Sequence, residues 1–109
     1  MMETTLSRPK IAGFTSEVEQ FADEHGITEI VYAMYEAAWR LFPMAGQIRV
    51  QLGEDYEDSS WRHIDFEIEQ LTITETEAYL LDRRWLVEVY SHCPAEHAWL
   101  FTHRLSFAE

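Results

Sequence analysis

Residues 47–70 read QIRVQLGEDYEDSSWRHIDFEIEQ and decide the fold of this chain. Two runs alternate strictly between apolar and polar side chains, with Ile48-Val50-Leu52 in the first and Ile64-Phe66-Ile68 in the second. Such alternation is typical of strands with one buried and one solvated face. The stretch therefore predicts a β-hairpin that closes through the acidic loop 53–60.

Two helices are predicted before the hairpin. The first opens at Thr15-Ser16, where Ser16 and Glu19 have the spacing of a capping box, and it ends at Gly26. The second runs from Thr28, a candidate N-cap, to Phe42, because Pro43 cannot continue a helix. Apolar residues surround most of the second helix, which indicates a central position in the core.

A third helix and a third strand are predicted after the hairpin. Thr74 and Glu77 repeat the capping-box spacing, and apolar residues recur at helical intervals over 75–90. The part at 85–90 is also rich enough in aromatic and β-branched residues to form a strand, but the capped start and the length favour a helix. Residues 97–107 alternate again and predict a strand.

The predicted fold class is α+β, with the order α-α-β-β-α-β and a small mixed three-stranded sheet that helices cover on one face. A strand, a helix and a strand in succession usually form a crossover between parallel strands. Residues 1–13 are expected to form a flexible N-terminal arm, and residues 14–109 a single domain, since 109 residues are too few for two cores. The order of strands in the sheet stays open.

The composition of the chain disfavours several classes of partner and location. The chain carries 20 acidic and 8 basic residues, a formal net charge of −12, which disfavours nucleic acid and anionic membranes as partners. One cysteine cannot form an internal disulfide, and we see neither a secretion signal nor an apolar membrane span. The expected location is therefore the cytoplasm.

The polar side of the predicted hairpin is the main candidate site. Strand parity places Trp61, His63, Asp65, Glu67 and Glu69 on one exposed plane next to the acidic loop. The candidate partner-binding residues are Asp55, Tyr56, Glu57, Trp61, His63, Asp65, Glu67 and Glu69. We expect a non-enzymatic module, such as a regulator, inhibitor, immunity or antitoxin-type protein, that docks a basic protein partner. The simpler interpretations are an ion-pair ladder, in which Arg49 and Arg104 pair with these carboxylates, or charge that only keeps the chain soluble.

An alternative site is the cluster Cys93, His97 and His103, whose side chains suit zinc and would make a small zinc-binding or metal-dependent hydrolytic protein. Its spacing matches no zinc motif, and His103 shares parity with core residues, which favours a hydrogen-bonded structural histidine. Neither a phosphate-binding loop nor a nucleophile elbow is present, so enzymatic activity is disfavoured and no cofactor is predicted. Open strand edges make a homodimer plausible.

Overall fold

The structure is a computed structural model that describes residues 14–54 and 62–108. Its elements confirm the predicted α+β class and order. They are α1 (Ser16–Glu24), α2 (Thr28–Leu41), β1 (Gln47–Glu54), β2 (Arg62–Leu71), α3 (Glu75–His92), the 3₁₀ helix η1 (Ala95–Leu100) and β3 (Phe101–Phe107). The predicted arm at residues 1–13 lies outside the described residues.

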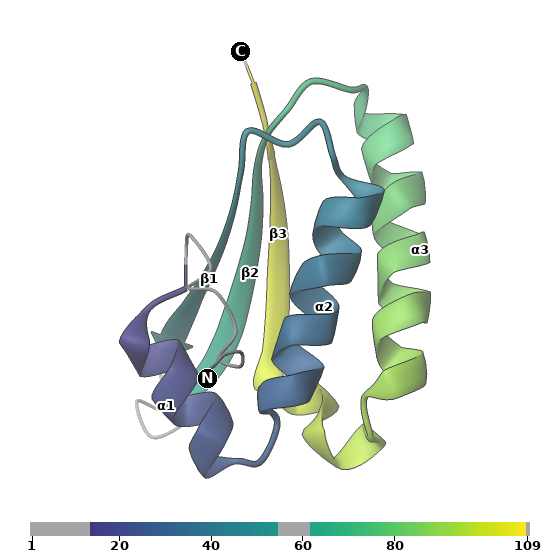
Figure 1. Cartoon of the computed structure of the whole chain (residues 1–109). Coiled ribbons are helices and arrows are strands. Elements are labelled where there is room, and N and C mark those ends of the chain that lie inside the picture. Colours follow the sequence, from purple (N-terminus) through teal and green to yellow (C-terminus); the bar gives the residue numbers. More distant parts are fainter. Residues whose placement is uncertain (1–13, 55–61, 109) are drawn as a thin grey trace, which may run out of the picture.

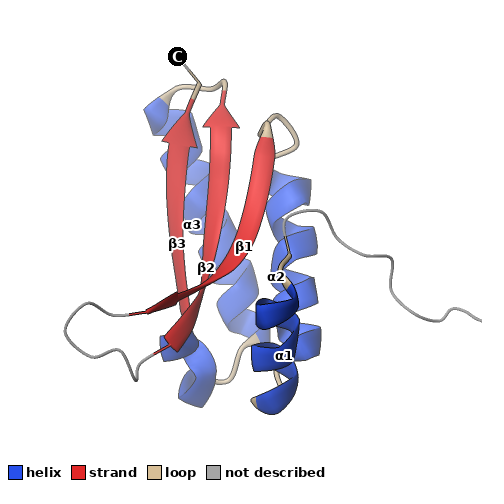
Figure 2. Ribbon diagram, turned by 90° about the vertical axis from the view of Figure 1, so that its left-hand side faces the viewer, coloured by secondary structure: helices blue, strands red, loops and turns tan. Residues whose placement is uncertain are grey.

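The three strands form one mixed sheet in the order β1-β2-β3. β1 and β2 are antiparallel, and β2 and β3 are parallel, as expected for strands joined through α3. Helices α2 and α3 pack side by side on one face of the sheet (Figure 1). Figure 2 shows the strands in front of these two helices, with α1 beside β1. The polar face of the sheet is therefore the face away from α2 and α3.

The predicted hairpin has the expected register. Val50 lies opposite Phe66 and Ile48 opposite Ile68, and all four side chains are buried. The alternation breaks at Gln70, which has a positive φ of 60° and lies where the pairing of β2 with β3 shifts. Because of this irregularity Leu71 turns back into the core, where simple alternation would place it on the polar side.

The helix boundaries follow local capping rules with small corrections. The side chain of Thr15, not of Ser16, accepts a hydrogen bond from the Val18 N–H and caps α1. Gly26 has a φ of 67°, as predicted for the residue that ends this helix region. The N-cap of α2 is Ile27, one residue before the predicted Thr28, and it makes no side-chain capping bond.

The ambiguous segment 85–90 is helical, as predicted. Thr74 and Glu77 form the complete capping box that starts α3. Trp85 is only 1% exposed, whereas Val87 is 74% exposed, a difference that a strand with both side chains on one face would not produce. The Trp85 indole N–H donates a hydrogen bond to the main-chain oxygen of Met34 at 3.0 Å, which joins α3 to α2.

The third strand is shorter than predicted. Residues 95–100 form η1 directly after Pro94, so that β3 begins at Phe101 and not at His97. The alternation over 97–107 would place Trp99 on the same buried face as Phe101, but Trp99 is exposed. The hydrogen bond from its indole N–H to the Glu96 main-chain oxygen, 2.8 Å long, holds it within the turn of η1.

Candidate functional site

The polar face of the sheet carries a ladder of alternating charges across all three strands. Its members are Asp65, Glu67 and Glu69 on β2, Arg49 on β1 and Arg104 on β3. Arg49 contacts Glu69 at 2.7 Å and Glu67 at 3.1 Å. Arg104 contacts Asp65 at 3.0 Å and also pairs with Glu67. The interpretation in which these two arginines neutralise the carboxylates is confirmed.

The expectation of an exposed acidic plane is wrong for its two central members. Asp65 is 6% exposed and Glu67 is 8% exposed, although both face away from the helices. Their neighbours cover them: Thr102 donates to Asp65 at 2.9 Å, and Gln51 donates to Glu67 at 2.7 Å. Two side chains from each adjacent strand therefore satisfy this pair of carboxylates, and a cationic partner would have to displace them.

The central carboxyl groups differ in pKa. Burial acts most strongly on Asp65 and would raise its pKa, but a hydrogen bond with Glu67 opposes this. Together with the bonds from Thr102 and Arg104, that contact holds the pKa of Asp65 below its usual range. For Glu67, burial and the adjacent carboxyl groups raise the pKa above its usual range. Glu67 is therefore the member of this pair that takes up a proton first as the pH falls.

Only one of the five remaining candidate residues, His63, belongs to the described part of the chain. Asp55, Tyr56, Glu57 and Trp61 lie outside the described residues. His63 lies on β2 opposite Gly53, and its imidazole is so close that a Cβ atom on Gly53 would lie 2.6 Å from the imidazole Nε2. A residue with a side chain at position 53 would therefore fit only if the His63 imidazole moved away.

The alternative zinc residues lie in three different environments. Cys93 follows α3, and burial raises the pKa of its thiol. His97 lies in η1, 3.8 Å from Glu96. His103 faces the helices from β3 and contacts Asp82 at 3.1 Å, as expected for a structural histidine. Among the described residues, no three side chains of histidine, cysteine, aspartate or glutamate are grouped to hold a metal ion.

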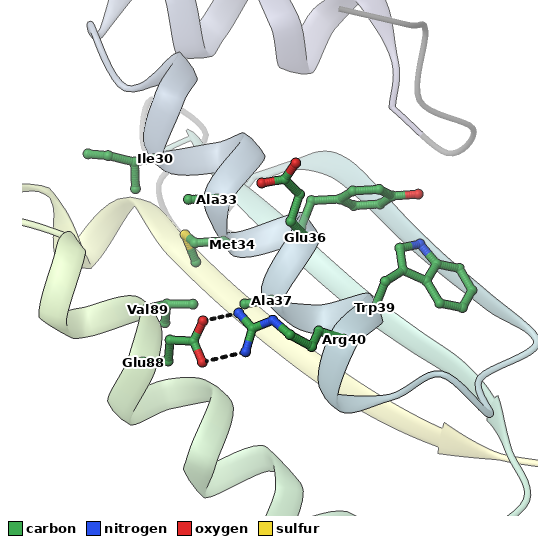
Figure 3. Close-up of a pocket in the computed structure, with 10 residues that line it drawn as sticks. Ile30, Ala33, Met34, Glu36, Ala37, Trp39, Arg40, Glu88 and Val89 are labelled. Carbon is green, nitrogen blue, oxygen red and sulfur yellow. Dashed lines mark hydrogen bonds and ion pairs between the residues drawn. The ribbon is translucent and has the colours of Figure 1, made fainter.

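A groove that sequence reasoning missed lies along the outer surface of α2, where α3 passes beside it. It encloses about 600 Å³. Its apolar lining comes from residues four apart on α2 and from α3, and includes Ile30, Ala33, Met34, Ala37 and Val89. Arg40 of α2 reaches across to Glu88 of α3 with a paired contact, one bond of which is 3.0 Å long (Figure 3). In the sequence, the small residues Ala33 and Ala37 are the one feature that could have indicated this groove. The groove itself forms only because α3 packs beside them.

Comparison with protein-family models, curated proteins and solved structures finds no match to this chain. Within the residues that the structure describes, none of the helices is both long enough and apolar enough to cross a bilayer.

Proposed function

We propose that this protein is a non-enzymatic binding module that receives a basic, amphipathic helical segment of a partner protein in the groove between α2 and α3. The observation that carries the proposal is the groove itself, whose volume of about 600 Å³ lies within the range of protein binding pockets. Its apolar lining is open to solvent at Ala33 and partly at Ile30. A regulator, inhibitor, immunity or antitoxin-type protein would use such a surface to capture its partner.

The groove is a better docking surface than the charge ladder because of what each one offers. In the ladder, Asp65 and Glu67 already accept hydrogen bonds from within the chain, so binding would first break satisfied contacts. In the groove, Ala33 is exposed and its side chain has no polar group, so a partner side chain that contacts it displaces no hydrogen bond. The groove between α2 and α3, and not the polar face of the sheet, is therefore the proposed docking surface.

The charge of the chain favours a basic partner. The formal net charge of −12 attracts cationic segments over several ångströms and accelerates their encounter with the surface. The exposed Glu36 of α2 lines the groove, and Arg40, the cation in the lining, is already paired with Glu88 of α3. A helix with apolar residues at positions i, i+3, i+4 and i+7 and with lysines along its sides would match both features.

A titration with synthetic peptides tests the docking surface. The probe is a leucine–lysine peptide with helical amphipathic spacing, and its control has the same composition in scrambled order. We expect the amphipathic peptide to shift the amide resonances of Ala33, Ala37 and Val89 in ¹⁵N-labelled protein, with little response to the scrambled peptide. Shifts centred on Glu67 and Glu69 would instead show that the peptide binds the charge ladder, and would contradict docking in the groove.

A matched pair of variants tests the groove directly. Ala33→Arg fills the groove and adds a positive charge, so it should weaken peptide binding by about tenfold or more, as a lost contact of 1.4 kcal/mol or more implies. Val87→Arg adds the same charge on the exposed outer side of α3, outside the lining residues, and should leave binding nearly unchanged. Equal weakening by both variants would show that only net charge matters and would reject the groove.

The same two variants identify a natural partner. Proteins captured by the immobilised wild-type chain from its native cells are compared by quantitative mass spectrometry with those captured by Ala33→Arg and by Val87→Arg. A true partner is lost with Ala33→Arg and retained with Val87→Arg. If no captured protein shows this pattern, the proposed function is wrong.

A further inference from the structure

β3 forms one edge of the sheet, and within the described residues it pairs only with β2. An edge strand presents unpaired main-chain N–H and C=O groups that can bond another strand. We propose that two copies of this chain associate through β3, which pairs with itself in antiparallel orientation. The result is a continuous six-stranded sheet in which the α3 helices of the two copies pack side by side.

Contacts made by α3 show which of its sides faces past this edge. Glu88 points to α2, because it pairs with Arg40, and Asp82 points to β3, because it contacts His103. Each residue of an α-helix is rotated by about 100° from the one before it. The side opposite Glu88, and adjacent to Asp82, consists of the residues that we call the α3 flank: Tyr79, Arg83, Leu86 and Tyr90.

The α3 flank exposes two large aromatic side chains. Tyr79 is 55% exposed and Tyr90 is 48% exposed, while Leu86 is partly buried. Aromatic side chains and arginine are the residues that protein interfaces favour. Because the α3 flank lies beside the edge strand β3, the two form one continuous surface.

The spacing of the elements fits a pair of helices across a twofold axis. α3 lies over β2 and β3, because Trp85 contacts Phe66 of β2 at 5.5 Å between ring centroids and His103 of β3 at the same distance. Neighbouring strands are about 4.8 Å apart, so pairing of two β3 strands would place the two α3 axes about two strand spacings, or 10 Å, apart. Packed helices lie about 8–10 Å apart, so the helices would touch without a gap or a clash.

Strand parity and the level of α3 select one register. A twofold axis perpendicular to the sheet keeps the helices of both copies on one face, so each residue of β3 must pair with one of the same parity. His103 lies at the level of Asp82 and Trp85, close to the middle of the α3 flank. An axis at His103 then brings Tyr79 opposite Tyr90 of the partner subunit, and Arg83 opposite Leu86 of the partner subunit.

Charge favours β3 over the other edge of the sheet. The β1 edge is bordered by α1, whose exposed acidic residues would repel a second acidic chain, and Phe14 already bridges to Val50 there. These acidic residues are Glu17, Glu19, Asp23 and Glu24. On this edge the exposed acidic residue is Glu75, four residues before Tyr79 at the start of α3, and Arg83 is the exposed basic residue of the α3 flank. Asp82 and Arg104 each pair with an opposite charge within the chain, so this edge carries fewer uncompensated acidic charges than the β1 edge. In a chain of net charge −12, this is a surface on which two copies can approach.

Sedimentation equilibrium of the full chain tests the association. We expect a mass of twice the monomer value of 12.9 kDa at micromolar concentration. The double variant Tyr79→Glu/Tyr90→Glu should sediment as a monomer, because it places repelling carboxylates on the α3 flank. Leu80→Glu/Val87→Glu, which carries the same charge on the outward side of α3, should remain dimeric. Circular dichroism confirms that each variant keeps its helical fold.

A spin-label distance measurement tests the strand register. Ser106 is exposed on the polar face of β3, and Ser106→Cys is labelled in a Cys93→Ala background so that each copy carries one label. With the axis at His103, the two labelled positions are separated by about six strand steps, or 20 Å. A monomeric wild-type chain, a dimer that only the outward variants disrupt, or a label distance far from this value would overturn the proposal.

Discussion

We expect the packing of α3 against α2 to depend strongly on the side chain of Trp85. It lies on α3, is 1% exposed, and donates its indole N–H to the Met34 main-chain oxygen of α2 at 3.0 Å. Its ring also contacts Phe66, with 5.5 Å between ring centroids, at the centre of the sheet. The substitution Trp85→Phe keeps an aromatic ring but removes the donor and part of the packed volume.

The cost of Trp85→Phe follows from these two losses. The hydrogen bond contributes about 0.5–1.5 kcal/mol. The smaller ring leaves a cavity that adds about 1–2 kcal/mol, which is less than the roughly 3–5 kcal/mol observed when a large aromatic residue is cut to alanine. We therefore expect the free energy of unfolding to fall by about 1.5–3.5 kcal/mol. For a domain of this size the melting temperature should fall by roughly 10–20 °C.

Urea unfolding followed by far-UV circular dichroism measures this change, since the signal comes from the helices and not from tryptophan. Wild type and variants are compared at one protein concentration, because self-association would shift the apparent stability. Val87→Ser is the control: Val87 lies two residues away and is 74% exposed, so the expected change is within about 0.5 kcal/mol. A loss below about 0.5 kcal/mol for Trp85→Phe, or an equal loss for Val87→Ser, would refute the role assigned to this helix face.

Three further predictions concern charge and backbone geometry. The hydrogen bond with Asp82 raises the pKa of His103 above the usual imidazole value of about 6.5. The pair therefore stabilises the fold fully below that pH, and the contribution is lost as the pH rises through the folded-state pKa. Thermal unfolding between about pH 5.5 and pH 8.5 should show Asp82→Asn destabilising the protein most at the acidic end, and a constant difference would contradict the pairing. Gln70 has a positive φ of 60°, a backbone conformation that favours glycine. Gln70→Gly should therefore raise the free energy of unfolding or leave it unchanged, whereas Gln70→Val should lower it by about 1–2 kcal/mol. The reverse order of stabilities in urea unfolding would exclude strain at this position. Arg104→Met removes the positive charge that pairs with Asp65 and Glu67, so it should destabilise the fold more than Arg84→Met at neutral pH. In an Asp65→Asn/Glu67→Gln background, a double-mutant cycle should show that this difference is lost.

The helices and strands could be predicted because their signals are local. Alternation at 48–52 and 64–68 and the capping box at Thr74 and Glu77 involve residues that are near in sequence, and each appears in the structure as expected. Errors arose where a local signal was weak or misleading. Alternation at 97–100 looked like a strand, but Pro94 is followed there by the turn of η1.

The candidate site was predicted only in part. Parity correctly placed Asp65, Glu67 and Glu69 on the side away from the helices, and the pairing with Arg49 and Arg104 was foreseen as an alternative. Burial was not foreseen, because it depends on Thr102 and Gln51 of the adjacent strands closing over the carboxylates. The parity of β3 relative to β2 depends on a crossover whose register no local pattern specifies.

By itself, the amino-acid sequence determined which segments are helices and strands and which face of each is apolar, since both follow from the spacing of side chains along one element. Tertiary structure alone decided which charges remain exposed, where α2 and α3 leave a groove, and which strand forms the free edge. The physical reason is that these properties belong to pairs of elements: Arg104 covers Glu67, and Glu88 reaches Arg40, only because the chain brings distant segments together.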